Sequence, residues 1–139
     1  MLIANCATCD KGIHKHSFEI SRHELLFENN AFTVFESVGL FPYCSEKCIK
    51  AIISNINNAY DQSVKRWAGW RKNCDSCGCF INRNQLHISI NLEEYEYSFD
   101  GTRAECLQSD ELAIFCCQEC SEEFLNKLDS YNRYTTKSS

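Results

Sequence analysis

Apolar residues recur at every second position in two separate stretches of this chain, a pattern typical of β-strands. In the first stretch Phe18 and Ile20 alternate with polar neighbours, and Asn29-Asn30 separates Leu25-Leu26-Phe27 from Phe32-Thr33-Val34-Phe35. Two consecutive asparagines favour the tight turn of a β-hairpin. The second stretch repeats the alternation before a turn at Asp100-Gly101, at Leu86, Ile88, Ile90, Leu92, Tyr95, Tyr97 and Phe99. We therefore expect β-hairpins in both halves.

A helical pattern follows each strand region. Ser45 is a good N-cap residue and Glu46 suits a first helical turn. From Ile49 onward, a stripe roughly 120° wide holds the apolar side chains, namely Ile52, Ile53, Ile56, Tyr60, Val64 and Trp67. This predicts a helix of about five turns that ends at Gly69 and packs its distal half on the second unit or on another copy of the chain. A shorter equivalent is predicted from Phe124, Leu125, Leu128 and Tyr131, before a polar tail, 135–139, that we expect to be frayed.

Cysteines occur in the same arrangement in both halves of the chain. Cys6-x2-Cys9 precedes Cys44-x3-Cys48, just as Cys74-x2-Cys77 precedes Cys116-x3-Cys120. An insertion of four residues in the second half aligns the two sets, because their first pairs are 68 positions apart and their second pairs 72. In this alignment Tyr43 corresponds to Phe115, and Phe18 and Ile20 correspond to Leu86 and Ile88. The pattern predicts one ancestral unit duplicated, with units at 1–69 and 70–139.

The cysteine spacing indicates metal binding. Two residues between thiols let one tight turn present both sulfurs to an ion, and a C-x3-C pair on the first turn of a helix does the same, because positions i and i+4 share a face. A disulfide framework is the alternative. The start of the chain lacks a secretory signal pattern, and eleven cysteines are an odd number. We therefore expect two four-thiolate sites holding two Zn²⁺ ions per chain, with iron as the alternative metal.

The cysteine context resembles a known family of small zinc folds. An aromatic residue followed by Cys-Ser-x-x-Cys opens the first helix, as in Tyr43-Cys44-Ser45-Glu46-Lys47-Cys48, and Phe115-Cys116-Cys117-Gln118-Glu119-Cys120 is similar except that Cys117 replaces serine. This resembles the treble-clef zinc fingers of the TRASH, YHS and MYM type. The resemblance implies metal binding and interaction with proteins or nucleic acids. The fold class we expect is a small, metal-stabilised α+β protein of two tandem treble-clef-like units, each with a thiol knuckle, β-hairpins and a helix.

The net charge limits the classes of partner that we expect. The formal charge is −5, and eight thiolates with two zinc ions bring it to about −9. Such a surface repels phosphate backbones, so nucleic acid is disfavoured as a partner. The exception is a segment of four cations around two tryptophans, Lys65, Arg66, Trp67, Trp70, Arg71 and Lys72. We interpret it as the helix end and the seam between the units, with a nucleic-acid contact as the alternative.

Other residues could join the metal sites. His14 and His16 follow the first thiol pair, and Cys79 and Cys117 lie beside the second site, so all four are possible alternative ligands. Cys106 is left over, and His23 and His87 have no evident partner in the sequence. The acidic run Glu93-Glu94-Tyr95-Glu96 is interpreted as the solvated face of a strand.

These observations favour a binding module. We find no glycine-rich phosphate loop and no open metal site with a nearby base, so catalysis is not expected. The first hypothesis is an acidic protein-interaction adaptor, or a small inhibitor of the immunity type, that contacts a protein partner through Glu94, Tyr95 and Tyr97. The alternatives are a nucleic-acid-binding finger that uses residues 65–72 and a metal sensor or carrier. Without an apolar run long enough for a membrane span, the protein is expected to be intracellular and cytoplasmic.

Overall fold

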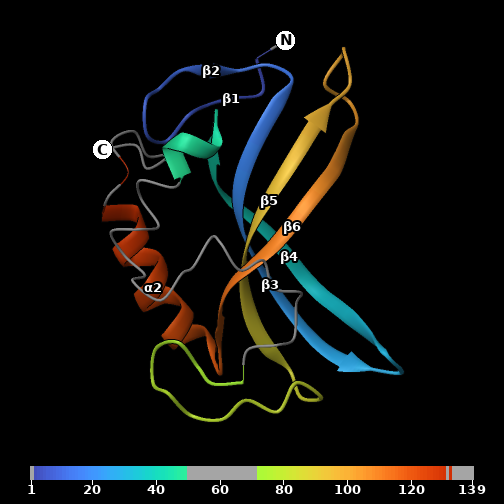
Figure 1. The fold of residues 1–139 in the computed structure, drawn as a ribbon, viewed down its shortest axis with the longest axis vertical. Coiled ribbons are helices and arrows are strands. Elements are labelled where there is room, and N and C mark those ends of the chain that lie inside the picture. Colours follow the sequence, from blue (N-terminus) through green and yellow to red (C-terminus); the bar gives the residue numbers. More distant parts are fainter. Residues whose placement is uncertain (1, 50–71, 131, 133–139) are drawn as a thin grey trace.

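The chain forms a small α+β structure around one four-stranded antiparallel sheet (Figure 1). The computed structural model describes residues 2–49, 72–130 and 132. The named elements are β1 (Ala4–Asn5), β2 (Gly12–Ile13), β3 (His16–Glu28), β4 (Ala31–Tyr43), β5 (His87–Tyr97), β6 (Ala104–Phe115) and α2 (Gln118–Ser130). Residues 46–49 are also helical, and together with α2 they lie on one side of the sheet. The expected stripe from Ile52 to Trp67, Tyr131 and the polar tail lie outside the described residues.

Strands from both halves of the chain join one sheet, with the order β4-β3-β5-β6. β3 pairs with β4 through the predicted Asn29-Asn30 turn, whose two positive φ angles, 52° and 64°, match a type I′ hairpin. β5 pairs with β6 in the same way, and β3 and β5 pair with each other at the centre. The hairpins expected in both halves are therefore present as one long hairpin in each half, and the two hairpins pair with each other in a single sheet.

The two hairpins repeat each other down to their irregularities. Each has two register shifts, and the unpaired residues are Phe35 and Leu40 on β4 and Leu107 and Leu112 on β6. These positions correspond at the same offset of 72 residues that relates the second cysteine pairs. β-bulges are built-in features that bend a strand and raise its twist, so matching bulges support descent of both hairpins from one unit.

The register corrects one detail of the sequence alignment. Phe18 pairs with Tyr43, and the corresponding pair in the second hairpin is Ile88 with Phe115. Phe18 thus corresponds to Ile88, whereas the sequence alignment matched it to Leu86, which lies before β5 and is 56% exposed. The inserted residues are divided between the segment before β5 and the hairpin, so one gap could not represent them.

The central pairing has the symmetry of a two-fold interface. Ser21 lies opposite Asn91, its own counterpart in the second hairpin, and Ile20 opposite Leu92 mirrors Arg22 opposite Ile90. A residue pairing with its own counterpart is what an isologous contact requires. The two hairpins are therefore arranged like the subunits of a symmetric dimer joined in one chain.

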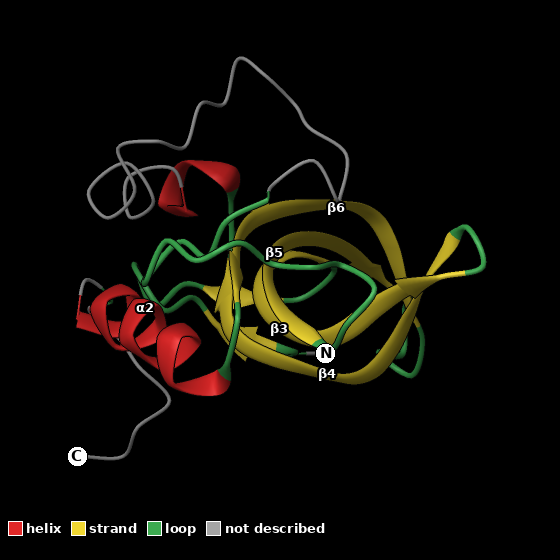
Figure 2. Cartoon of the chain, turned by 90° about the horizontal axis from the view of Figure 1, so that it is seen from below, coloured by secondary structure: helices red, strands yellow, loops and turns green. Residues whose placement is uncertain are grey.

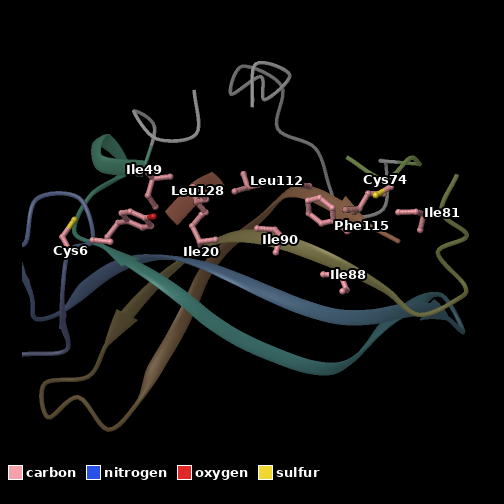
Figure 3. Close-up of a cluster of buried hydrophobic side chains, with 14 residues drawn as sticks. Cys6, Ile20, Ile49, Cys74, Ile81, Ile88, Ile90, Leu112, Phe115 and Leu128 are labelled. Atoms are coloured by element: carbon pink, nitrogen blue, oxygen red, sulfur yellow. The ribbon is translucent and has the colours of Figure 1, made fainter. Parts of the chain in front are cut away.

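One hydrophobic core lies between the sheet and α2 (Figure 3). Ile20 and Ile90 from the two central strands are fully buried beside Leu128 of α2, and the rings of Phe115 and Phe124 pack at a tilt of 47° with 5.5 Å between their centroids. Cys6 and Cys74 are themselves members of this core and lie at its two ends. Burial of one isoleucine side chain is worth about 1.5–3 kcal/mol. Because each half of the chain supplies one of the two central isoleucines, both halves contribute to the stability of this core.

The opposite face of the sheet is polar and yet largely buried. Neighbouring strand residues point to opposite faces, so Ser21, Ser89 and Asn91 face away from the isoleucines, and all three are buried. The strands curl around a common axis instead of lying flat (Figure 2). That curl encloses the polar face, which holds an Arg83–Glu111 ion pair with N···O distances of 2.8 and 3.0 Å.

We predict that Ile90→Ala lowers the free energy of unfolding by about 2–5 kcal/mol, because it leaves a cavity in the shared core. The control is Leu86→Ala, which shortens an exposed side chain and should change the stability by no more than about 0.5 kcal/mol. Urea unfolding of both variants with metal present measures this. Equal effects of the two substitutions would contradict a core continuous between the halves.

Candidate metal centres

Each C-x2-C pair lies on a turn of the same geometry. The N–H of Cys6 donates to the carbonyl of Lys11 at 2.9 Å, and the N–H of Cys74 donates to that of Cys79 at 2.8 Å. Within each turn, the N–H of the residue after the second cysteine donates to the carbonyl of the first cysteine, from Asp10 to Cys6 and from Gly78 to Cys74, both at 2.9 Å. Asp10 and Gly78 both have positive φ, 63° and 79°. These contacts define a thiol knuckle that the chain contains twice.

Each knuckle is tied to the end of an edge strand. The N–H of Ala7 donates to the carbonyl of Pro42, two residues before Cys44, and the N–H of Asp75 donates to that of Ile114, two residues before Cys116. Both bonds are 2.9 Å long. They place each knuckle beside the start of the helix that carries the second cysteine pair.

In both units the second cysteine pair spans the start of a helix, with Cys44 and Cys116 just before the cap residue and Cys48 and Cys120 in the first turn. Ser45 caps the first helix as predicted, since its hydroxyl accepts the N–H of Cys48 at 3.4 Å. Cys117 takes the same role before α2, because its sulfur accepts the N–H of Cys120. The turn into each helix brings both sulfurs of the pair together, with Sγ–Sγ separations of 3.9 Å for Cys44–Cys48 and for Cys116–Cys120.

Knuckle and helix bring four sulfurs together at each site. In both tetrads the ligand atoms all lie within 4.8 Å of one another, and the sets are Cys6, Cys9, Cys44 and Cys48, then Cys74, Cys77, Cys116 and Cys120. The sulfurs that join knuckle to helix are 3.5 Å apart for Cys9–Cys44 and 3.6 Å for Cys77–Cys116. A tetrahedral ion with metal–sulfur bonds of about 2.3 Å requires sulfurs about 3.8 Å apart. All of these cysteines are free thiols. The two tetrads can therefore bind metal ions.

The thiols of each tetrad differ in acidity. Burial raises the pKa of Cys6, but backbone hydrogen bonds from its own knuckle and from Cys44 lower it more, to about 7. Backbone and side-chain hydrogen bonds from Cys79 lower the pKa of Cys77 to about 6. Burial and a hydrogen bond to Cys9 raise the pKa of Cys44 to about 12. Each tetrad thus contains one thiol with a lowered pKa, Cys6 or Cys77, beside one with a raised pKa, Cys44 or Cys116.

The possible histidine ligands lie elsewhere. Among the described residues, each tetrad consists of cysteines alone. His16 points to the other hairpin and contacts Glu94, with 2.5 Å between Nε2 and Oε2. Neither His14 nor His16 belongs to a tetrad. The remaining cysteines differ, because Cys79 and Cys117 contact sulfurs of the second tetrad while Cys106 lies on β6 opposite Tyr95.

The structure describes only part of the expected partner surface. Of the basic segment 65–72, only Lys72 is described, and it is exposed. Glu94, Tyr95 and Tyr97 lie on β5 and are half-buried, with the two tyrosine rings 6.5 Å apart. Burial is the main factor that raises the pKa of Tyr95.

The acidic run was misinterpreted in one respect, because Glu93 is not solvated. It is 6% exposed, accepts a hydrogen bond from Ser21, and lies 3.4 Å from Nε2 of His23. Although burial raises the pKa of Glu93, the hydrogen bonds from His23 and Ser21 outweigh burial and hold it below the ordinary value. The sequence contained no signal for this cluster, since Ser21 and His23 lie on β3 and Glu93 lies on β5, and only the pairing of these strands brings them together.

No known protein-family description, curated protein or solved structure that we compared with the chain matches it. Within the described parts of the chain, no helix is both long and apolar enough to cross a membrane. Function must therefore be argued from the two tetrads and the surface around them.

We predict that bound metal is released as the pH falls from 7 towards 5. Protons compete with the metal for the thiolates, so the affinity should fall about tenfold per pH unit for each thiol that gains a proton. Dialysis of the loaded protein at a series of pH values, followed by elemental analysis, measures the bound metal. Undiminished metal content at pH 5 would contradict binding by thiolates.

Proposed function

We propose that this chain is a protein-interaction module whose scaffold is held by two structural Zn²⁺ ions. The observation that carries the proposal is the convergence of four sulfurs at each end of one hydrophobic core. Four protein sulfurs fill a tetrahedral coordination sphere, whereas catalytic zinc keeps one position for water or substrate. We therefore assign the ions a structural role and propose no catalytic activity.

Zinc is the ion that suits these sites best. Each tetrad joins chain segments that are far apart in sequence, which is how structural zinc stabilises small folds. The pairing of a knuckle with a first helical turn is also what the treble-clef resemblance implies. Four thiolates suit iron as well, so the test below identifies the metal.

The proposed partner is a protein with a basic surface. The chain carries a formal charge of −5, and β5 displays Glu94 and Glu96 on the hairpin that extends away from α2 (Figure 1). Within the same chain, Lys15 lies 3.6 Å from Glu96 and His16 contacts Glu94. Complementary charge speeds association and favours one orientation. Half-buried tyrosines beside these carboxylates are suited to anchor an interface.

We predict that the purified, reduced chain retains two zinc ions after dialysis against a dilute weak chelator. Cys44→Ser should leave one ion, at the second tetrad, and Cys116→Ser should leave one at the first, because three thiolates hold zinc less tightly than four. Cys106→Ser is the matched control and should retain both, since Cys106 belongs to neither tetrad. Elemental analysis with native mass spectrometry counts and identifies the ions. Iron in place of zinc, or an unchanged zinc count in Cys44→Ser, would overturn the assignment.

For the partner, we predict that zinc-loaded chain captures a basic protein from native extract after nuclease treatment. Glu94→Lys should weaken this capture at least tenfold, because it reverses a charge on the proposed surface. Glu122→Lys makes the same charge change on the exposed side of α2 and should leave capture intact. Capture that disappears with nuclease would favour the nucleic-acid alternative, and equal loss in both variants would refute a contact at β5.

A further inference from the structure

The two metal centres differ at two positions where their backbones are equivalent. Cys74 bonds to the carbonyl of Cys79 as Cys6 bonds to that of Lys11, so Cys79 occupies the place of Lys11. Cys117 caps its helix as Ser45 caps the other, so Cys117 occupies the place of Ser45. The first centre has an ammonium and a hydroxyl at these places, and the second has two more thiols.

Cys79 lies against one edge of the second tetrad. Its thiol contacts the sulfurs of both Cys77 and Cys116, which are 3.6 Å apart. Cys79 is exposed, as is Cys77, so this edge faces solvent. Gly78 has a positive φ of 79°, and this turn brings Cys79 back to the cluster. The space beside the α-carbon of Gly78 is open.

Cys117 lies against an adjoining edge of the same tetrad. Its sulfur contacts those of Cys116 and Cys120 and accepts backbone N–H groups at the start of α2. It is also exposed. Cys116 is therefore the sulfur that both additional thiols share as a neighbour, and the six sulfurs form one continuous cluster from the buried Cys74 to the exposed Cys77, Cys79 and Cys117.

We propose that the second centre binds an additional thiophilic metal ion at the Cys77–Cys116 edge, with Cys79 and Cys117 as its further ligands. The inference rests on the proposed function, because Cys77 and Cys116 would be shared with the ion inside the tetrad. Each binding thiol gives its proton to solvent as the metal–sulfur bond forms. Soft thiolates select ions such as Cu(I), Cd²⁺ and Zn²⁺.

Charge balance supports the additional ion. One divalent ion in four thiolates leaves about −2, and two divalent ions in six thiolates leave the same charge. The additional ion therefore compensates the two additional thiolates. At the first centre, Lys11 already supplies a positive charge near the knuckle and Ser45 offers no thiolate, so that centre is expected to hold one ion.

The test is a titration of the reduced full-length chain with Cd²⁺, with bound ions counted by native mass spectrometry. The wild type should bind three ions, the third more weakly because its bridging thiolates are shared. The double variant Cys79→Lys/Cys117→Ser gives the second centre the residues of the first and should bind two. Cys106→Ser removes a thiol outside the cluster and should bind three.

A gain-of-binding variant completes the test. Lys11→Cys/Ser45→Cys gives the first centre six thiols and should raise the count to four. Two ions in the wild type, or three in the Cys79→Lys/Cys117→Ser variant, would overturn the additional site while leaving the proposed structural role intact. Fewer than two ions in the wild type would instead overturn the metal proposal itself, so the two failures can be told apart.

Discussion

The convergence of a knuckle and a helix start at each end of the core is the constraint on which this structure depends. Cys6 and Cys74 are core residues as well as candidate ligands, so the sulfurs and the hydrophobic side chains occupy the same packing. The thiols of each tetrad hydrogen-bond to one another, at 3.5 Å for Cys9–Cys44 and 3.6 Å for Cys77–Cys116. An ion that replaces the thiol protons links segments more than thirty residues apart in sequence. This cross-link lowers the conformational entropy lost on folding, a cost that a small hydrophobic core alone barely offsets.

Two matching hairpins form the architecture around these two centres. Each unit contributes a bulged hairpin, and the hairpins meet through a self-complementary pairing centred on Ser21 and Asn91. An unpaired hairpin edge is prone to unwanted association, and joining the two inner edges within one chain removes half of that risk. The same pairing gives the two units one core, in which Ile20 and Ile90 are neighbours (Figure 3). Symmetry is then broken where function can differ, at Lys11 against Cys79 and at Ser45 against Cys117.

The local features of the fold could be predicted from the sequence, because short-range chemistry determines them. The Asn29-Asn30 turn, the Ser45 cap and the two cysteine sets follow from residue types at fixed spacing, and the structure contains all three. The shared sheet could not be predicted, since alternation shows that a strand exists but not which strand it pairs with. Burial of Glu93 could not be predicted either, because it results from the curl of the whole sheet (Figure 2).

The proposed function depends on metal bound by sulfur at both ends of the core. X-ray absorption at the zinc edge of the purified, reduced protein tests that claim most directly, because it reports the number, type and distance of the atoms around the ion. We expect four sulfur neighbours at about 2.3 Å for each tightly held zinc and no shell of nitrogen or oxygen. Mixed sulfur and nitrogen coordination, or a folded protein that contains no zinc, would contradict it.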